Sequence, residues 1–222
     1  GMGRGLYDTE PVFRHALDRM ATAFDASPSD ADSGDADGGD ADGGDADGGD
    51  EAPHPLLDVL FDREGRGKLV DDTRYTQPAL YALEFALSEL WKSWGVRPAA
   101  VCGHSLGEYV AATVAGIIAP EEALRLVTHR ARLMARLPRT GPLAGAMAAV
   151  LAEGQVVADA LAELPGNIPG RCLGIAAYNA PENTVISGDV ASIAAALDLF
   201  VKRGIPAERL TVSHAFHSPL VE

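Results

Sequence analysis

A short apolar run passes directly into a glycine-bounded pentapeptide near the middle of the chain, and this limits the possible folds more than any other feature. Residues 99–102 are apolar, Gly103-His104-Ser105-Leu106-Gly107 follows them, and a helix-compatible run comes next. Small residues on both sides of a serine allow a sharp strand-to-helix turn that exposes its hydroxyl, as in a nucleophile elbow. We therefore expect a strand over 99–102, a helix from Glu108 to about Gly116, and a nucleophilic Ser105 between them. The alternative is an ordinary glycine-rich turn with a solvent-facing serine.

The segments around this turn alternate between strand and helix patterns, which favours an α/β architecture. One helix is expected from Thr76, with Pro78 near its start and Gly95 at its end. Its large apolar residues recur on one face and predict a core helix: Leu80, Leu83, Leu87, Trp91 and Trp94. A further helix is expected from Pro120 to about Arg136, because acids open it and arginines close it, as the helix dipole favours.

After Pro142 the pattern changes to a compact β-α-β-β-α-β unit, the order of a ferredoxin-like subdomain. Its expected elements are strands at 147–151, 173–178, 183–187 and 208–212, and helices at 155–164 and 190–203. We place this small subdomain at residues 143–212, inserted into a larger α/β subdomain. The larger one comprises residues 1–26 and 53–142, and residues 213–222 return to it.

Residues 27–52 form an acidic insertion of Asp, Gly, Ala, Ser and Pro with a five-residue repeat. The insertion holds ten of the 32 acidic residues and no Lys or Arg. The rest of the chain has 22 acidic and 18 basic residues, so most of the formal charge of −14 lies in the insertion. Asp40 and Asp42 begin like a calcium-binding loop, but Asp45 stands where that loop requires glycine. Such a segment buries too little apolar surface to repay its ordering entropy, so we expect it to be disordered.

Composition also excludes several classes of partner. The body of the chain lacks the cluster of Lys and Arg that nucleic-acid binding needs, so no nucleic-acid partner is expected. The longest apolar run, residues 109–119, falls short of the roughly 20 residues that span a bilayer, so no membrane partner is expected. Two cysteines, Cys102 and Cys172, are too few for a disulfide framework, and the N-terminal residues do not show a positively charged segment followed by an apolar one, so we expect a reducing, cytoplasmic compartment.

A serine nucleophile needs a base, and the chain has six histidines: His15, His54, His104, His129, His214 and His217. His15 and His54 are expected at the surface. His104 leaves the elbow in another direction than Ser105, which suits packing beneath the loop. His214 and His217 lie together just past the last predicted strand and are the remaining candidates. A half-built metal site is the alternative there, but no nearby Cys or carboxylate completes it, and we expect no metal.

Two further groups complete the expected chemistry. The Leu106 amide lies at a helix N-terminus, so it is the natural half of an oxyanion hole. Arg130 lies on a helix face with Ala123, Val127 and Met134, where a guanidinium is costly unless it is paired. One interpretation is structural: the Arg130 side chain extends to the solvent or forms a salt bridge with a carboxylate of the protein. The other is functional: its planar guanidinium binds a substrate carboxylate through two hydrogen bonds.

Several motifs together resemble one family. Gly103-His104-Ser105-Leu106-Gly107-Glu108-Tyr109, Thr76-Gln77-Pro78-Ala79-Leu80 and Ser213-His214-Ala215-Phe216-His217-Ser218 are similar to the malonyl-CoA:acyl carrier protein transacylases. They resemble most closely the acyltransferase domains of modular polyketide synthases. The similarity covers most of the chain apart from the acidic insertion.

This resemblance implies a fold and a reaction. The fold is an α/β-hydrolase-like large subdomain with an inserted ferredoxin-like one. The reaction is ping-pong transfer of a malonyl unit from malonyl-CoA to the phosphopantetheine of an acyl carrier protein, beside a ketosynthase in the same chain and with no permanently bound cofactor. By this analogy Ser105 attacks the thioester, His217 takes its proton and Arg130 holds the free carboxylate. Gln77, His104, His214 and Phe216 are the other substrate-binding candidates, and the stretch His214-Ala215-Phe216-His217 goes with malonyl rather than methylmalonyl.

The family also has a Gly-Gln-Gly segment upstream of Gly1 and a segment downstream of Glu222, so the resemblance implies a domain truncated at both ends. Two alternatives remain. A serine hydrolase or thioesterase of the α/β type would need an acid between the serine and the histidine, for which Asp159, Asp189 and Asp198 are the candidates. A catalytically incompetent docking fragment of a synthase is the second.

Overall fold

The computed structural model describes residues 2–27, 54–138, 141, 144–164, 172–212 and 214–221. The expected disordered insertion at 27–52 lies outside these residues, apart from Ser27. The chain divides into two compact units, Gly1–Arg132 and Leu133–Glu222, and each is described by itself. None of the described helices is both long enough and apolar enough to cross a membrane.

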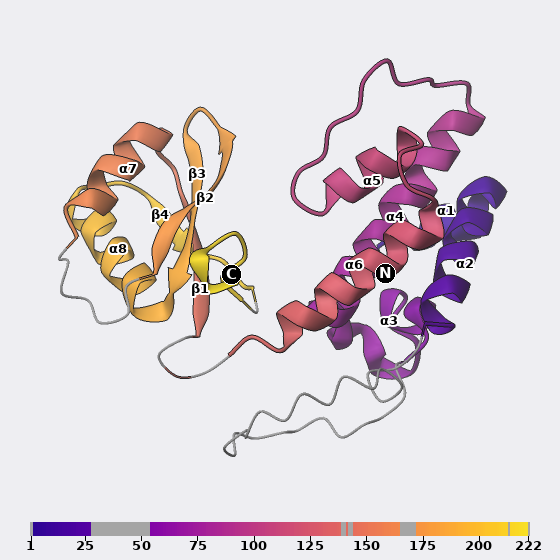
Figure 1. Cartoon of the computed structure of the whole chain (residues 1–222), viewed down its shortest axis with the longest axis horizontal. Helices are drawn as coiled ribbons and strands as arrows, with labels where there is room; N and C mark the ends of the chain where they lie inside the picture. Colours follow the sequence, from indigo (N-terminus) through magenta and orange to yellow (C-terminus); the bar gives the residue numbers. More distant parts are fainter. Residues whose placement is uncertain are drawn as a thin grey trace. The chain divides into compact units, whose positions relative to one another are not determined.

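All the regular elements in the described residues of unit 1 are helices (Figure 1). Its elements are α1 (Arg4–Thr9), α2 (Pro11–Asp25), α3 (Leu56–Leu60), the 3-10 segment η1 (Arg63–Asp71), α4 (Thr73–Ser93), α5 (Gly107–Val114) and α6 (Pro120–Ala135). Proline opens α2 and α6, where its missing N–H costs nothing. Asp72 caps α4 by accepting a hydrogen bond from the Arg74 amide.

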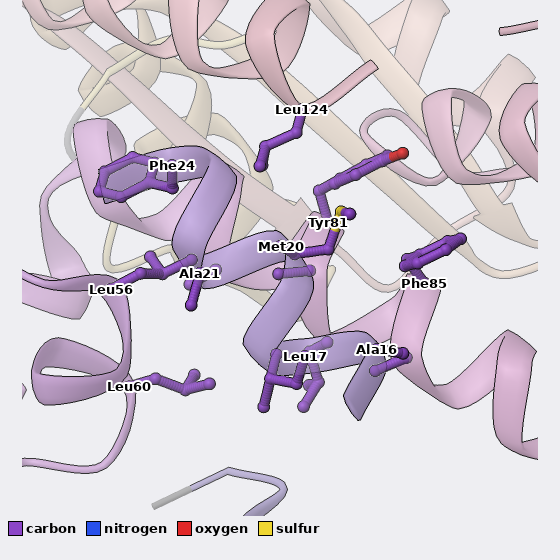
Figure 2. Close-up of a cluster of buried hydrophobic side chains, with 14 of the residues drawn as sticks. Ala16, Leu17, Met20, Ala21, Phe24, Leu56, Leu60, Tyr81, Phe85 and Leu124 are labelled. Carbon is purple, nitrogen blue, oxygen red and sulfur yellow. The ribbon is translucent and has the colours of Figure 1, made fainter. Parts of the chain in front are cut away.

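The core of unit 1 forms where α2 crosses α4 and α3. Leu17, Met20 and Phe24 recur along α2 at helical spacing, and each is at most 5% exposed. Figure 2 shows them packed with Leu56 and with residues of α4 and α6. Fully burying a side chain of this size contributes about 1.5–3 kcal/mol, so this apolar stripe holds α2 on α4.

The expected strand at 99–102 is absent, and the described residues of unit 1 contain no strand. Val101 and Cys102 are exposed instead. An isolated extended segment cannot satisfy its backbone groups without a neighbour, and no described segment of this unit pairs with it. The elbow therefore follows a loop here.

The tryptophans of the predicted core face are the second correction. Leu83 is buried as expected, but Trp91 and Trp94 are 54% and 57% exposed. Leu90 in the last turn of α4 is still buried, so the two indoles lie on the face of this turn that the core does not cover, and they pack edge to face with ring centres 5.2 Å apart.

Unit 2 has the predicted β-α-β-β-α-β order. Its elements are β1 (Gly145–Val150), α7 (Gly154–Ala162), β2 (Leu173–Ala180), β3 (Asn183–Asp189), α8 (Val190–Lys202) and β4 (Ala207–Arg209), followed by η2 (Pro219–Val221). The strands form one antiparallel sheet in the order β2-β3-β1-β4, in which Met147 pairs with Ser187 and Ala149 with Glu208. Both helices cover one face of the sheet in Figure 1. This is the ferredoxin-like topology.

The C-terminal stretch groups with unit 2, although the sequence boundaries placed it in the larger subdomain. Ala215 lies against the start of β1, where a Cβ added to Gly145 would stand 2.4 Å from the Ala215 nitrogen. The His214 ring contacts the Leu137 carbonyl in the same unit. These two local contacts hold the described residues 214–221 there.

Candidate active site

Ser105 adopts the left-handed backbone conformation that an elbow nucleophile requires, with φ of 53°. The turn closes through the Gly107 amide, which donates to the His104 carbonyl at 3.0 Å, and the Glu108 amide, which donates to the Ser105 carbonyl at 3.1 Å. The Glu108 carboxylate also accepts from the Gly103 amide at 2.9 Å. A non-glycine residue is held left-handed only where its surroundings enforce it, so this turn is built around the serine.

Gly103 permits the turn sterically. A Cβ at this position would lie 2.0 Å from the Gly107 carbonyl carbon and 2.1 Å from the Glu108 nitrogen. At Gly107, by contrast, a Cβ would meet only the Glu84 carboxylate at 3.7 Å, an ordinary contact. The two glycines of the motif therefore have different structural roles.

Leu106, the oxyanion candidate, lies at the start of a helix. Leu106 is buried and stands immediately before α5, where helix amides lack partners one turn back. The turn bonds use the amides of Gly107, Glu108 and Tyr109, and within the described residues no such bond is recorded for the Leu106 amide. This amide can donate to an oxyanion.

His104 does not pack beneath the loop as expected. It is exposed and lines a cavity of about 590 Å³ with Gly103, Ser88, Trp91 and Glu84. The turn is closely packed at Gly103, where an added Cβ would meet the backbone of Gly107 and Glu108. Burial raises the pKa of Glu84, which lies in the same wall.

Arg130 is paired within unit 1, but with an amide. Its Nη1 donates to the Gln77 Oε1, so the structure brings two predicted substrate-binding residues together. The Gln77 Nε2 in turn donates to the Thr73 hydroxyl at 2.8 Å. The Arg130 guanidinium also lies 6.0 Å from the centre of the Tyr109 ring. No carboxylate among the described residues forms a salt bridge with Arg130, so its charge is not neutralised by the protein there.

His217, in unit 2, is also left-handed, with φ of 57°. It occupies a turn that the Ser218 hydroxyl closes by donating to the Ala215 carbonyl at 2.7 Å. The same oxygen accepts from the Leu220 amide at 3.2 Å. His217 is exposed on this turn, whereas Ser218 is buried beneath it.

The other histidine of the pair faces the interior. His214 is 2% exposed, and its Nε2 lies 3.3 Å from the Leu137 carbonyl oxygen. The Phe216 ring packs beside it at 5.9 Å. His214 thus supports the turn from within unit 2. The described residues contain no group of three His, Cys, Asp or Glu side chains suited to a metal ion.

Sequence reasoning missed three contributors: Thr73, Glu108 and Ser218. Thr73 lies four residues before Gln77, the spacing that places two side chains on one helix face, and this could have indicated it. Glu108 and Ser218 form side-chain hydrogen bonds to backbone groups of their own turns. Short polar motifs allow such bonds but do not show that they form.

Within unit 1, a left-handed serine in a tight turn before a helix, and a guanidinium without a carboxylate partner among the described residues, are features typical of proteins with a serine nucleophile and an acidic substrate. The chain belongs to the acyl transferase domain family, whose model matches residues 1–222. It is 39% identical to polyketide synthase GfsA of Streptomyces halstedii over 224 residues, which are 100% of this chain and 3% of that synthase.

Two solved structures give the same result. The acyltransferase domain from the second module of the salinomycin polyketide synthase is 38% identical, with a TM-score of 0.74 over 98% of this chain and 42% of that one. A malonyl-transacylase in complex with its type II polyketide synthase acyl-carrier protein is 25% identical, with a TM-score of 0.74 over 97% of this chain and 59% of that one. These matches confirm the family and the α/β fold class expected from the sequence.

Proposed function

We propose that this protein transfers a malonyl unit from malonyl-CoA to the phosphopantetheine thiol of an acyl carrier protein, in polyketide assembly. The observation that carries the proposal is the backbone of its two central residues. Ser105 and His217 are both left-handed, and both lie within the residues that match the family. Strained residues of this kind concentrate at functional sites.

The reaction proceeds in two balanced halves. The Ser105 Oγ attacks the thioester carbonyl while His217 takes the hydroxyl proton, and the Leu106 amide donates to the oxyanion. The C–S bond breaks, and His217 returns the proton to the departing coenzyme A thiolate. In the second half the carrier thiol gives its proton to His217 and attacks the serine ester. Ser105 leaves as an alkoxide and recovers the proton from His217.

Arg130 supplies the preference for a dicarboxylic acyl group. Its guanidinium lacks a carboxylate partner among the described residues, and Gln77 holds one of its donors. The other N–H groups of the planar guanidinium can donate two parallel hydrogen bonds to the free carboxylate of the malonyl group. His104, His214 and Phe216 complete the proposed substrate contacts, directly or by support of the histidine turn.

The proposed partners follow from this reaction. They are the coenzyme A thioester, the carrier protein and a neighbouring ketosynthase in the same polypeptide, in the cytoplasm, with no permanently bound cofactor. Two relatives support the carrier and the synthase: the transacylase solved with its acyl-carrier protein, and GfsA, of which this chain matches a small part.

A serine hydrolase would need an acidic residue as the third member of its catalytic triad, and none of the three candidates in unit 2 is suited to that role. Both carboxylate oxygens of Asp189 accept backbone amides, from Ser192 at 2.8 Å and Cys172 at 2.9 Å. Asp159 is exposed and accepts from Gln155 at 2.8 Å. Asp198 is exposed on α8. These acids have structural or surface positions, which favours transfer over hydrolysis.

The test of the nucleophile is intact-mass analysis of the natural full-length protein after mixing with malonyl-CoA. Ser105→Ala should abolish the malonyl adduct, because the attacking oxygen is gone. Ser88→Ala is the matched control, since Ser88 lines the cavity that Gly103 and His104 also line, and its hydroxyl bonds only to its own helix, at the Phe85 carbonyl. Passage of the adduct to a phosphopantetheine thiol supports the proposal, and release to water supports the hydrolase. A malonyl adduct that survives in Ser105→Ala would refute it.

The carboxylate clamp has its own test, the ratio of kcat/KM for malonyl-CoA to that for acetyl-CoA. Each hydrogen bond to a charged group is worth about 1.5–3 kcal/mol, so Arg130→Ala should lower malonyl transfer by roughly tenfold to a hundredfold or more. Arg130→Lys should recover little, because a point charge cannot reproduce the fork. If the ratio is the same in wild type, Arg130→Ala and Arg130→Lys, then Arg130 has a structural role and does not bind the substrate carboxylate.

A further inference from the structure

Thr73 is a buried polar residue to which neither the sequence motifs nor the proposed reaction gives a role. It is the first residue of α4 and is 3% exposed. Its hydroxyl oxygen accepts from the Gln77 Nε2 at 2.8 Å, and the Gln77 Oε1 accepts from the Arg130 guanidinium. The three side chains form a continuous hydrogen-bonded row from the first turn of α4 to α6.

The chemistry of a glutamine amide gives this row a direction. An amide has an acceptor oxygen at one end and a donor nitrogen at the other, whereas a guanidinium only donates. Gln77 can meet Arg130 only with its oxygen, which turns its NH₂ group toward Thr73. A hydroxyl oxygen there accepts that donor, so Thr73 favours the amide orientation that holds Arg130. Gln77 is 6% exposed, so water cannot readily replace a lost partner.

The scaffold keeps the two helices in place around this row. Thr73, Gln77 and Tyr81 follow one another at intervals of four residues, on one face of α4. The Tyr81 hydroxyl lies 2.9 Å from the Thr113 hydroxyl on α5, and it donates to the carbonyl of Pro120, the first residue of α6, at 3.0 Å. The helix backbones are fixed independently of Thr73, so its hydroxyl acts on the Gln77 side chain.

We propose that Thr73 is a positioning residue for substrate selectivity: it orients Gln77, which fixes the Arg130 guanidinium to receive the carboxylate of the acyl group. This rests on the proposed malonyl transfer. An arginine with an unrestrained side chain must lose rotamer freedom when it binds a carboxylate, and a held one has already lost it. The hydroxyl of Thr73 therefore contributes to carboxylate binding without touching substrate.

The test compares three variants of the natural full-length protein. Thr73→Val keeps the volume and the branched Cβ but removes the hydroxyl, and Thr73→Ser keeps the hydroxyl. Thr128→Val is the matched control, because Thr128 is also 3% exposed and its hydroxyl bonds only along its own helix, to the Leu124 carbonyl at 2.8 Å. It removes the same group from α6, two residues from Arg130.

Thr73→Val should lower kcat/KM for malonyl-CoA by about three- to tenfold, the effect of one misaligned hydrogen bond. The loss should appear mainly in KM, because the carboxylate is bound in the ground state as well as in the transition state. Transfer from acetyl-CoA should change by less than about twofold. Thr73→Ser should restore the malonyl preference. If Thr73→Val lowers both substrates equally, as a merely structural role predicts, the selectivity role is refuted.

A second measurement is independent of activity. The side-chain Nε–Hε resonance of Arg130, observed by NMR with ¹⁵N-labelled arginine, should shift or broaden in Thr73→Val and stay unchanged in Thr128→Val. An unchanged resonance in Thr73→Val overturns the positioning role even if activity falls. If wild type shows no malonyl preference while the resonance shifts, the proposed function fails and the selectivity role fails with it, but the hydrogen-bonded row stands.

Discussion

Substitution of the two elbow glycines separates what the motif predicts from what the structure predicts. The motif treats Gly103 and Gly107 alike, since both flank the serine. In the structure a Cβ on Gly103 would lie 2.0 Å from the Gly107 carbonyl carbon, whereas one on Gly107 meets its nearest neighbour at 3.7 Å. Neither glycine is left-handed. The effect of alanine is therefore purely steric at the first site and nearly absent at the second.

The magnitude follows from this geometry. Ordinary contacts begin at 3.4 Å, so in Gly103→Ala the backbone must separate by roughly 1.4 Å. Overpacking costs about 1–3 kcal/mol, and the upper end applies because backbone atoms cannot rotate away as side chains do. Opening the turn also strains the hydrogen bond from the Gly103 amide to Glu108. In Gly107→Ala the helix gains up to about 1 kcal/mol, less in its first turn, because alanine loses less backbone entropy.

Urea unfolding and malonyl-adduct formation measure the two effects in one set of proteins. Gly103→Ala should lower the unfolding midpoint of unit 1 and suppress the adduct. Gly107→Ala should keep or slightly raise the midpoint and should leave adduct formation intact. If the two variants behave alike, or Gly103→Ala leaves adduct formation intact, then close packing of the elbow does not position Ser105.

Two predictions concern titratable groups. In unit 2, burial alone would raise the pKa of Asp189, but hydrogen bonds from Ser192 and from the Cys172 amide outweigh it and hold the pKa below its usual 3.8. Asp189→Asn should lower the free energy of unfolding, measured in urea at neutral pH, by about 1–3 kcal/mol. The difference between wild type and variant should shrink as the pH falls below 3.8, because the Asp189 carboxylate of the wild type becomes protonated. In unit 1, burial raises the pKa of Glu84 above 4.5, so wild type should lose stability relative to Glu84→Gln as the pH rises from 4.5. A difference that is constant with pH would contradict either assignment.

Local pattern was sufficient to predict unit 2. The order of strands and helices, the elements at Leu173–Ala180 and Val190–Lys202, and the ferredoxin-like topology agree with the sequence. Alternation along strands and apolar spacing along helices depend on near neighbours, and β2 and β3 form a local hairpin, although β1 pairs with strands much further along the chain. Only the last strand is shorter than expected, at Ala207–Arg209, because the chain turns where the Val212 amide bonds to the Leu210 carbonyl.

Unit 1 and its site could be predicted only in part. The apolar run at 99–102 carries a strand pattern, but a strand also needs a partner, and periodicity does not show whether one is present. Trp91 and Trp94 continue the apolar spacing of α4 but are exposed, because spacing shows which residues share a face and not whether another element covers it. Arg130 was found from its apolar face, yet its partner lies 53 residues away, and no local spacing reveals such a pair.

The left-handed conformations of Ser105 and His217 connect the stability of each unit to its chemistry. A non-glycine residue in this region costs roughly 1–2 kcal/mol relative to its ordinary conformation. In unit 1 that cost is offset by the backbone packing of Gly103 against Gly107 and by the hydrogen bond from the Gly103 amide to the Glu108 carboxylate. In unit 2 the buried Ser218 hydroxyl does so through two backbone bonds. Since neither device belongs to a hydrophobic core, each site can lose its geometry while its unit remains folded. Substitutions at Glu108 or Ser218 should therefore reduce acyl transfer before they measurably reduce the stability of the unit.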